Sequence, residues 1–181
     1  HADAAQHIAG AAPGGGGGRG PQHRVRLHAE GQARQHVALE LDHAFKSLDS
    51  DPRVRVILLK GAGKNFCAGI DVSELAGKTV NEYRAWIERM ENPLVTIGRM
   101  AKPVIAQVQG VAAANGAGLV AAADLAIAAD TAKMGLTAIN VGLNCVGPVI
   151  PVSRSVGRKI ALEMLLFGNF MEAKEALAKG L

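Results

Sequence analysis

Residues 102–130, KPVIAQVQGVAAANGAGLVAAADLAIAAD, hold two apolar runs on either side of a loop of small residues. The first run, 104–108, is predicted to be a buried strand, and the second, 119–129, a buried helix. Gly110 and Gly116 give the loop between them the backbone freedom of a tight turn. Such a turn directs backbone N–H groups out of a helix N-terminus, where an oxyanion or a phosphate binds well. The alternative is that the small residues only let helix and sheet pack closely.

The composition is that of a soluble globular protein. A chain of 181 residues predicts one domain with a hydrophobic core. Hydrophobic residues make up 49% of it and aromatic residues only 3%, so aliphatic side chains must build that core. The scarcity of aromatics and the modest net charge of +4 make nucleic acid an unlikely partner. No apolar run reaches the ~20 residues of a membrane helix, so no membrane partner is expected.

Residues 1–36 are predicted to form a flexible tail that contains glycine and arginine, with an unbroken glycine run at 14–18. The tail is poor in acidic residues, as transit peptides are, but it lacks their serines and amphipathic helix. The chain starts at His1 rather than Met and stops just after a helical pattern. We therefore expect further residues at both ends.

Periodicity and turn residues predict the remaining elements. They are a helix from Val37 to the stop at 49–52, a strand at 54–59, a small-residue turn at 65–71 with a short helix start at 71–74, a helix at 79–100 kinked or split at Pro93, a short strand at 133–135, a loop at 137–151, and helices at 158–167 and 172–179.

Few residues suit metal or acid–base chemistry. Cys67 and Cys145 are the only cysteines, which indicates a reducing compartment rather than a disulfide framework. All six histidines lie within the first 43 residues, so no Ser-His-Asp set can be placed. No zinc-ligand spacing and no P-loop is present, and no metal site is expected.

Three stretches resemble the crotonase (enoyl-CoA hydratase/isomerase) superfamily, in that family's order and spacing. They are GKNFCAGIDVSEL at 63–75, the central stretch at 102–130, and VGRKIALEMLLFGNFMEAKEALAKGL at 156–181. The resemblance implies an α/β fold, a crotonase-like ββα spiral, whose C-terminal helical part is apparently truncated. It covers 37–181, which is expected to form an acyl-CoA-binding core. The segment VGLNCVGP at 141–148 looks most like the enoyl-CoA hydratase domain-containing protein 3 type.

The resemblance also implies a site. The backbone N–H groups of Ala68 and Asn115 fall where the family forms an oxyanion hole, which polarises a thioester carbonyl and stabilises its enolate. Asn115 stands where most relatives have glycine, and asparagine tolerates unusual dihedral angles better than most residues. Lys64 is expected near the phosphates of coenzyme A, although a solvated surface lysine is the plainer interpretation. The substrate site is further expected to include Cys67, Gly69, Asp71, Gly116, Gly118 and Ala138.

The departures from the family pattern concern acid–base chemistry. The two glutamates with which hydratases of this family activate water fall at Gly118 and Ala138, and neither residue can carry a proton. Cys145 lies in the segment where related dehalogenases keep a nucleophilic aspartate. A depressed pKa would make it a nucleophile. With no histidine or lysine identifiable beside it, a small buried wall residue is the favoured interpretation.

Two functions therefore stay open. One is an acyl-CoA-binding enzyme of the hydratase/isomerase type, active in acyl-CoA or fatty-acid metabolism. The other is an inactive acyl-CoA-binding or regulatory protein on the same fold, with RNA binding as the least favoured option. No cofactor is expected beyond a coenzyme A thioester as substrate or ligand. The resemblance further implies a homotrimer or a dimer of trimers, in the cytoplasm or, in a eukaryote, the mitochondrial matrix.

Overall fold

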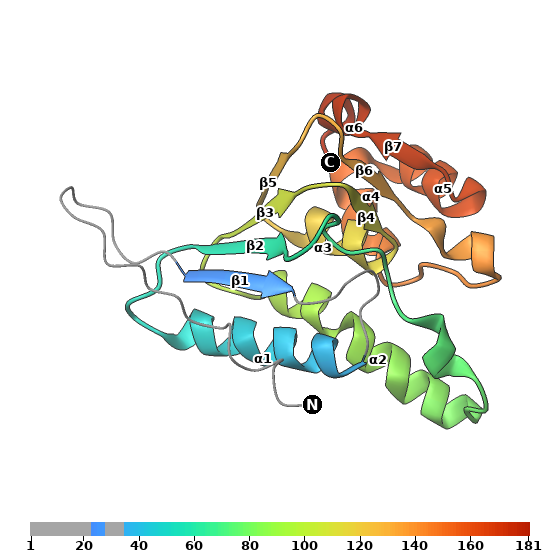
Figure 1. The fold of residues 1–181 in the computed structure, drawn as a ribbon, viewed down its shortest axis with the longest axis horizontal. Coiled ribbons are helices and arrows are strands. Elements are labelled where there is room, and N and C mark those ends of the chain that lie inside the picture. Colours follow the sequence, from blue (N-terminus) through green and yellow to red (C-terminus); the bar gives the residue numbers. More distant parts are fainter. Residues whose placement is uncertain (1–22, 28–34) are drawn as a thin grey trace.

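The computed structural model describes residues 23–27 and 35–181, in which helices and strands are interspersed along the chain (Figure 1). This mixed order confirms the predicted α/β class. With η for a 3-10 helix, the elements are β1 (His23–Leu27), α1 (Gln35–Ser50), β2 (Ile57–Gly61), η1 (Val72–Leu75), α2 (Val80–Ile97), β3 (Val104–Val108), β4 (Val111–Ala113), α3 (Asn115–Ala122), β5 (Leu125–Ala128), β6 (Lys133–Gly135), η2 (Thr137–Val141), α4 (Val149–Val156), α5 (Arg158–Phe167), β7 (Phe170–Glu172) and α6 (Ala173–Lys179).

The described strands form two sheets. β1, β2, β3 and β5 lie in that order in a parallel sheet, and β4, β6 and β7 form a second, mixed sheet. In the first sheet Ile57 pairs with Val104 and Leu59 with Ala106, and all four residues are fully buried. Helices α1 and α2 lie side by side along this sheet (Figure 1). Phe45 of α1 joins the same core cluster as these strand residues, so the helices cover the sheet's apolar face.

The chain passes from one sheet to the other within two residues, Gln109 and Gly110. Gly110 has φ +58°, and a Cβ atom there would lie 2.3 Å from the carbonyl oxygen of Lys64. Gln109 Nε2 donates hydrogen bonds to the carbonyl oxygens of Gly61 at 3.0 Å and Gly63 at 3.1 Å. These contacts hold the loop after β2 against the loop after β3.

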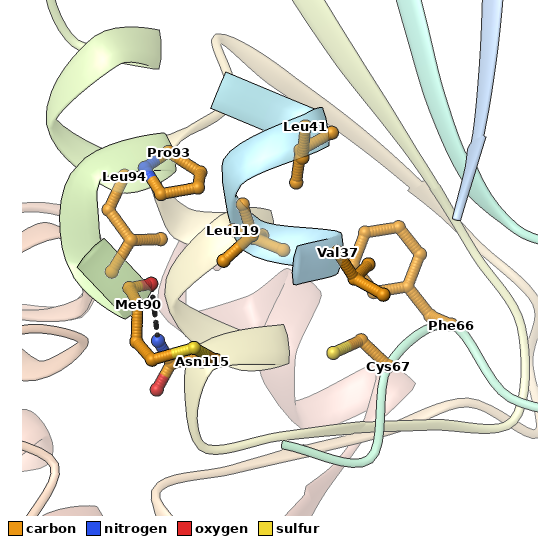
Figure 2. A pocket seen from close by; sticks show the side chains of 10 residues that line it. Val37, Leu41, Phe66, Cys67, Met90, Pro93, Leu94, Asn115 and Leu119 are labelled. Atoms are coloured by element: carbon orange, nitrogen blue, oxygen red, sulfur yellow. Dashed lines mark hydrogen bonds between the residues drawn. The ribbon is translucent and has the colours of Figure 1, made fainter. Parts of the chain in front are cut away.

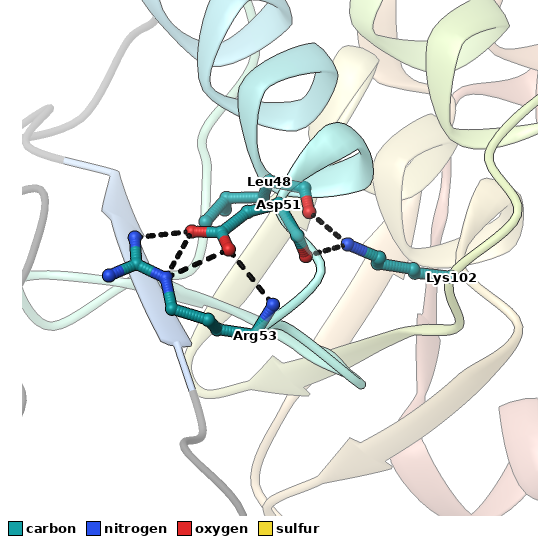
Figure 3. Close-up of polar contacts among 4 residues, drawn as sticks. All are labelled: Leu48, Asp51, Arg53 and Lys102. Atoms are coloured by element: carbon teal, nitrogen blue, oxygen red, sulfur yellow. Dashed lines mark hydrogen bonds and ion pairs between the residues drawn. The ribbon is translucent and has the colours of Figure 1, made fainter.

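A polar contact anchors the start of β3. Lys102 Nζ donates to the carbonyl oxygens of Leu48, at 2.7 Å, and of Asp51 (Figure 3). The Asp51 carboxylate accepts in turn from the Arg53 side chain, with the shortest contact at 2.7 Å. The ammonium group thus satisfies carbonyl groups at the end of α1 and ties that end to the strand that leads into the second loop.

Helix α2 begins with a capping box, in which the Thr79 side chain accepts from the Glu82 N–H and the Glu82 carboxylate accepts from the Thr79 N–H. The predicted helix at 79–100 is therefore present as a single element, because α2 runs through Pro93 without a split; a kink at this residue stays a prediction. Pro93 is buried, as are Met90 and Leu94 beside it. Burial of this face offsets the hydrogen bond that proline removes, which costs ~3 kcal/mol.

The predicted buried helix at 119–129 is half wrong. Helix α3 ends at Ala122, and Leu125–Ala128 forms the exposed edge strand β5. Asp124 causes the change, because its N–H donates to the Val104 carbonyl at 2.9 Å and its carboxylate accepts from the Val104 N–H at 2.8 Å. These two hydrogen bonds align the chain after Asp124 with β3. Leu125–Ala128 therefore forms a parallel strand, although its apolar sequence also suits a helix.

Two other predictions need correction, and one strand was missed. His23–Leu27 is strand β1, paired with β2, and α1 starts at Gln35, so these parts of 1–36 are ordered elements; the glycine run and the rest of the predicted tail lie outside the described residues. The predicted strand at 54–59 is shifted to Ile57–Gly61, where pairing with β3 sets its limits. Strand β7 was not predicted, since three residues carry too little periodicity. The predicted elements at 104–108, 133–135 and 158–167 are confirmed.

The tight connection between the two sheets predicts that alanine at two different glycines changes stability by very different amounts. Gly110→Ala should lower the free energy of unfolding by at least about 2 kcal/mol, because a left-handed dihedral and a collision with backbone add up. Gly63→Ala, whose Cβ would meet nothing within 4 Å, should change it by less than about 1 kcal/mol. Urea denaturation measures both, and equal losses would contradict this account of the passage.

Candidate functional site

Two turns, one after β2 and one after β4, pack directly on each other. The N–H groups of Phe66 and Cys67 both donate to the Val111 carbonyl at 3.1 Å, and the Ala113 N–H donates to the Cys67 carbonyl at 2.8 Å. A Cβ atom on Gly116 would lie 2.3 Å from that same Cys67 oxygen. The small residues therefore bring the two loops into contact, as the sequence indicated.

Ala68 and Asn115 flank this contact in the sequence, because Ala68 follows Cys67 and Asn115 precedes Gly116. Asn115 is the first residue of α3, and the N–H groups of a helix's first turn have no partner within the helix. In the part of the chain that the structure describes, the hydrogen bonds between the turns use the N–H groups of Phe66, Cys67 and Ala113, not those of Ala68 and Asn115. Backbone N–H groups without a protein partner are the kind of donor that serves an oxyanion.

The unusual backbone conformation lies one residue before Asn115. Ala114, the N-cap of α3, has φ +49° and is the only non-glycine residue with positive φ among those described. An alanine pays a steric cost there. The dihedral tolerance of asparagine therefore does not explain why Asn115 follows.

The Asn115 side chain serves a different purpose. Its Nδ2 donates to the Met90 carbonyl at 3.1 Å and so ties the start of α3 to α2 (Figure 2). Beside it lies a small apolar cavity of about 30 Å³, which Cys67 and Leu94 also line. This volume admits little more than one water molecule, so an acyl chain would have to displace side chains to enter it.

The two positions of the family's glutamates have different surroundings. A Cβ atom on Gly118 would lie 3.0 Å from Pro148 Cβ and 3.2 Å from Leu94 Cδ1, so Pro148 and Leu94 fill the space that a side chain would need. Ala138 is half-buried in η2, and its backbone hydrogen-bonds to the Cys145 thiol. Neither position offers a carboxylate.

A carboxylate that the sequence analysis missed lies close by. Glu91 of α2 is half-buried, and a Cβ atom on Gly147 would lie 2.2 Å from its Oε1. Burial raises the pKa of Glu91, and a hydrogen bond from the Gly147 backbone partly offsets that rise. Glu91 looks like an exposed helix residue in the sequence, because only the packing of α2 on the loop at 145–148 encloses it.

Cys145 is buried, with 3% of its surface exposed. Its pKa is raised, first by burial and then by the negative charge of Glu91, while the backbone of Ala138 lowers it in part. Burial likewise raises the pKa of Cys67. These directions oppose thiolate formation and favour the interpretation of both cysteines as wall residues.

The other predicted site residues lie around the first turn. Lys64 is exposed on the loop that precedes it, as a contact for phosphate groups or solvent would be. Gly69 has φ +101°, and a Cβ atom there would lie 3.3 Å from Ala114 Cβ. Asp71 caps η1 by accepting from the Ser73 N–H at 3.1 Å, which gives this residue a structural role.

The cysteine environments predict slow alkylation. With iodoacetamide at neutral pH, Cys145 should label no faster than Cys67, and both should label much more slowly in the folded protein than in urea, because burial withholds the thiolate. Mass spectrometry of the single variants Cys67→Ser and Cys145→Ser separates the two rates. Fast labelling of Cys145 that an acyl-CoA blocks would instead identify a nucleophile.

A metal site requires a cluster of ligand side chains, and a membrane-spanning helix requires a long apolar stretch. The described residues contain no group of three or more His, Cys, Asp and Glu side chains that is placed to hold a metal ion. None of their helices is long and apolar enough to span a bilayer.

Comparisons with known proteins place the chain in a family. The family model for enoyl-CoA hydratase/isomerase matches residues 33–181. Human mitochondrial enoyl-CoA hydratase domain-containing protein 3 is 38% identical over 145 residues, which are 76% of this chain and 48% of that protein. The 1,2-epoxyphenylacetyl-CoA isomerase of Escherichia coli is 36% identical over 143 residues, 76% of this chain and 54% of the enzyme.

Among solved structures, an enoyl-CoA hydratase of Mycobacterium smegmatis superposes with a TM-score of 0.83 at 36% identity, over 88% of this chain and 63% of that one. This chain thus spans about half the length of the curated relatives described here. The crotonase-like fold and the resemblance to the domain-containing protein 3 type are both confirmed. The match across most of the chain, together with the paired turns, shows that this chain belongs to the enoyl-CoA hydratase/isomerase (crotonase) family.

Proposed function

We propose that this protein binds acyl-CoA thioesters and stabilises the thioester enolate with the N–H groups of Ala68 and Asn115. One observation supports the proposal: Gly116 lies so close to the Cys67 carbonyl that the two loops are in contact, with Ala68 on one loop and Asn115 at the end of the other. Fixed donors in a largely dry site stabilise developing charge more strongly than water does. The E. coli relative is named as an isomerase of an acyl-CoA, which fits such chemistry.

We do not propose a standard two-glutamate hydration. Each positioned acid or base typically contributes ~10²–10⁴-fold, and Gly118 and Ala138 contribute none. Isomerisation needs only that one proton be moved at an enolate. The chemistry that an oxyanion hole and few acid–base groups support best is therefore proton transfer next to a thioester.

The oxyanion hole predicts that a thioester binds more tightly than the matching thioether. Butyryl-CoA should bind to the purified protein ~10–100-fold more tightly than S-butyl-CoA, because the thioether lacks the oxygen that both N–H groups would meet. Isothermal titration calorimetry measures both ligands under identical conditions. Equal affinities would overturn the oxyanion hole, and binding of neither ligand would overturn the function.

Lys64 gives a prediction about salt. If its ammonium group meets a phosphate of coenzyme A, Lys64→Ala should weaken butyryl-CoA binding and flatten the dependence of affinity on salt concentration. Lys78→Ala, a charge change beyond the first turn, is the control and should leave both unchanged. An unaltered salt dependence in Lys64→Ala would identify Lys64 as a solvated surface residue.

The second candidate is an acyl-CoA-binding or regulatory protein without turnover, and the absence of carboxylates at 118 and 138 favours it. Binding of butyryl-CoA without chemical change of any acyl-CoA would select this candidate. RNA binding is the least favoured function, and a gel shift at varied salt concentrations tests it.

We also propose that the full-length protein assembles as a homotrimer or a dimer of trimers, which light scattering tests. The human relative is named as mitochondrial. If the organism is a eukaryote, that name supports the mitochondrial matrix as the compartment. For any other organism we propose the cytoplasm.

A further inference from the structure

Glu91 lies where three elements meet, in the middle of α2. Its carboxylate lies against Gly147, in the loop that leads into α4: an added Cβ on that glycine would be 2.1 Å from Glu91 Cδ and 2.2 Å from Oε1. A side chain of any size at 147 would therefore displace the carboxylate. Glu91 is half-buried and forms no ion pair with the described residues, which costs free energy and calls for an explanation.

The position of Glu91 relates it to the two turns. Its neighbour Met90 accepts a hydrogen bond from the Asn115 side chain at 3.1 Å, so α2 is fixed to the residue that supplies one oxyanion donor. On the other side, Gly147 precedes Pro148, whose Cβ would lie 3.0 Å from a Cβ on Gly118. The Glu91 carboxylate thus lies against Gly147. The next residue, Pro148, fills the space that a side chain at position 118 would occupy.

We propose that Glu91 is the proton-transfer group of this acyl-CoA site and replaces, from α2, the carboxylate that Gly118 cannot supply. This inference rests on the proposed function. It makes the bound thioester the substrate of a one-carboxylate reaction, α-proton exchange or double-bond isomerisation, rather than of hydration.

The space beside Glu91 suits an acyl group. A cavity of about 470 Å³ lies between α2, α3 and α4, and Glu91, Leu94, Ala121, Gly147 and Ile150 are among the residues that line it. This is the size of a ligand pocket, in contrast to the small cavity of Figure 2. Leu94 lines both cavities, so the larger one adjoins the region of the two turns.

Burial, more than neighbouring charge, sets the pKa of Glu91. The thiol of Cys145 faces it from the loop at 145–148, and Arg99 of α2 and Arg154 of α4 line the same cavity. Burial dominates and raises the pKa of Glu91 above its ordinary value. A carboxylate with a raised pKa is a stronger base, so Glu91 is better suited to remove a proton from carbon than a solvated glutamate.

The proposed step balances without any further reactant. The Glu91 carboxylate removes a proton from the carbon next to the thioester carbonyl, the C–H electron pair moves into the enolate, and the oxyanion accepts hydrogen bonds from the two backbone N–H groups. The carboxylic acid then returns a proton to the same carbon or, in an enoyl thioester, to the carbon two positions further along. In D₂O the acid exchanges with solvent before it returns the proton, so deuterium enters the acyl group.

Deuterium incorporation into butyryl-CoA, followed by mass spectrometry with the full-length protein, tests the proposal. The wild type should catalyse exchange, and its rate should rise with pH through a pKa above about 4.3, the ordinary value for glutamate, because the carboxylate is the active form. Glu91→Gln should retain binding of butyryl-CoA in calorimetry and lose exchange ~10²–10⁴-fold. Glu88→Gln, the same change at an exposed position of α2, should keep the wild-type rate and pH profile.

A second variant guards against a folding defect in Glu91→Gln. Gly147→Ala leaves the carboxylate in the protein but moves it, and it should also lose most of the exchange while binding butyryl-CoA. Exchange that persists in Glu91→Gln, or wild-type protein that binds butyryl-CoA and exchanges nothing, would overturn the role of Glu91 alone. A wild type that does not bind butyryl-CoA would overturn the proposed function instead.

Discussion

The close approach of Gly116 to the carbonyl group of Cys67 is the constraint on which the candidate site depends. Any side chain at 116 would collide with that oxygen, and without the approach the hydrogen bonds between the two turns could not form together. Between β4 and α3 the chain turns at the single residue Ala114, which has the positive φ of +49°. The core of α1, α2 and the parallel sheet is the rigid support that maintains this arrangement.

The surroundings of the turns explain how the site departs from its family's pattern. Pro148 and Leu94 close over Gly118, so position 118 is a packed contact rather than a vacant place for a glutamate. The same loop carries Gly147, whose lack of a side chain leaves room for the Glu91 carboxylate. Loss of a carboxylate at one position and enclosure of another carboxylate nearby are thus linked through a single segment, 145–148.

Sequence reasoning succeeded where one local pattern determined the outcome. The run at 104–108 became β3 within those bounds, and α5 matched its predicted helix at 158–167. Sequence reasoning failed where a residue far away in the sequence determined the secondary structure of a segment. Leu125–Ala128 is apolar enough for a buried helix, but Asp124 bonds to Val104 and starts a strand at the sheet edge. His23–Leu27 is a strand because β2 pairs with it, which a glycine-rich neighbourhood does not reveal.

The sequence by itself determined the two small-residue turns, their order along the chain, the family that carries them and the absence of carboxylates at Gly118 and Ala138. These properties are local, since they depend on residue type and spacing alone. Only the tertiary structure decided the environment of each group. It buried Cys145 and raised its pKa, gave Asp71 a capping role and enclosed Glu91 between α2 and Gly147. Burial and electrostatics arise from segments that meet in space, and no pattern within a single segment contains them.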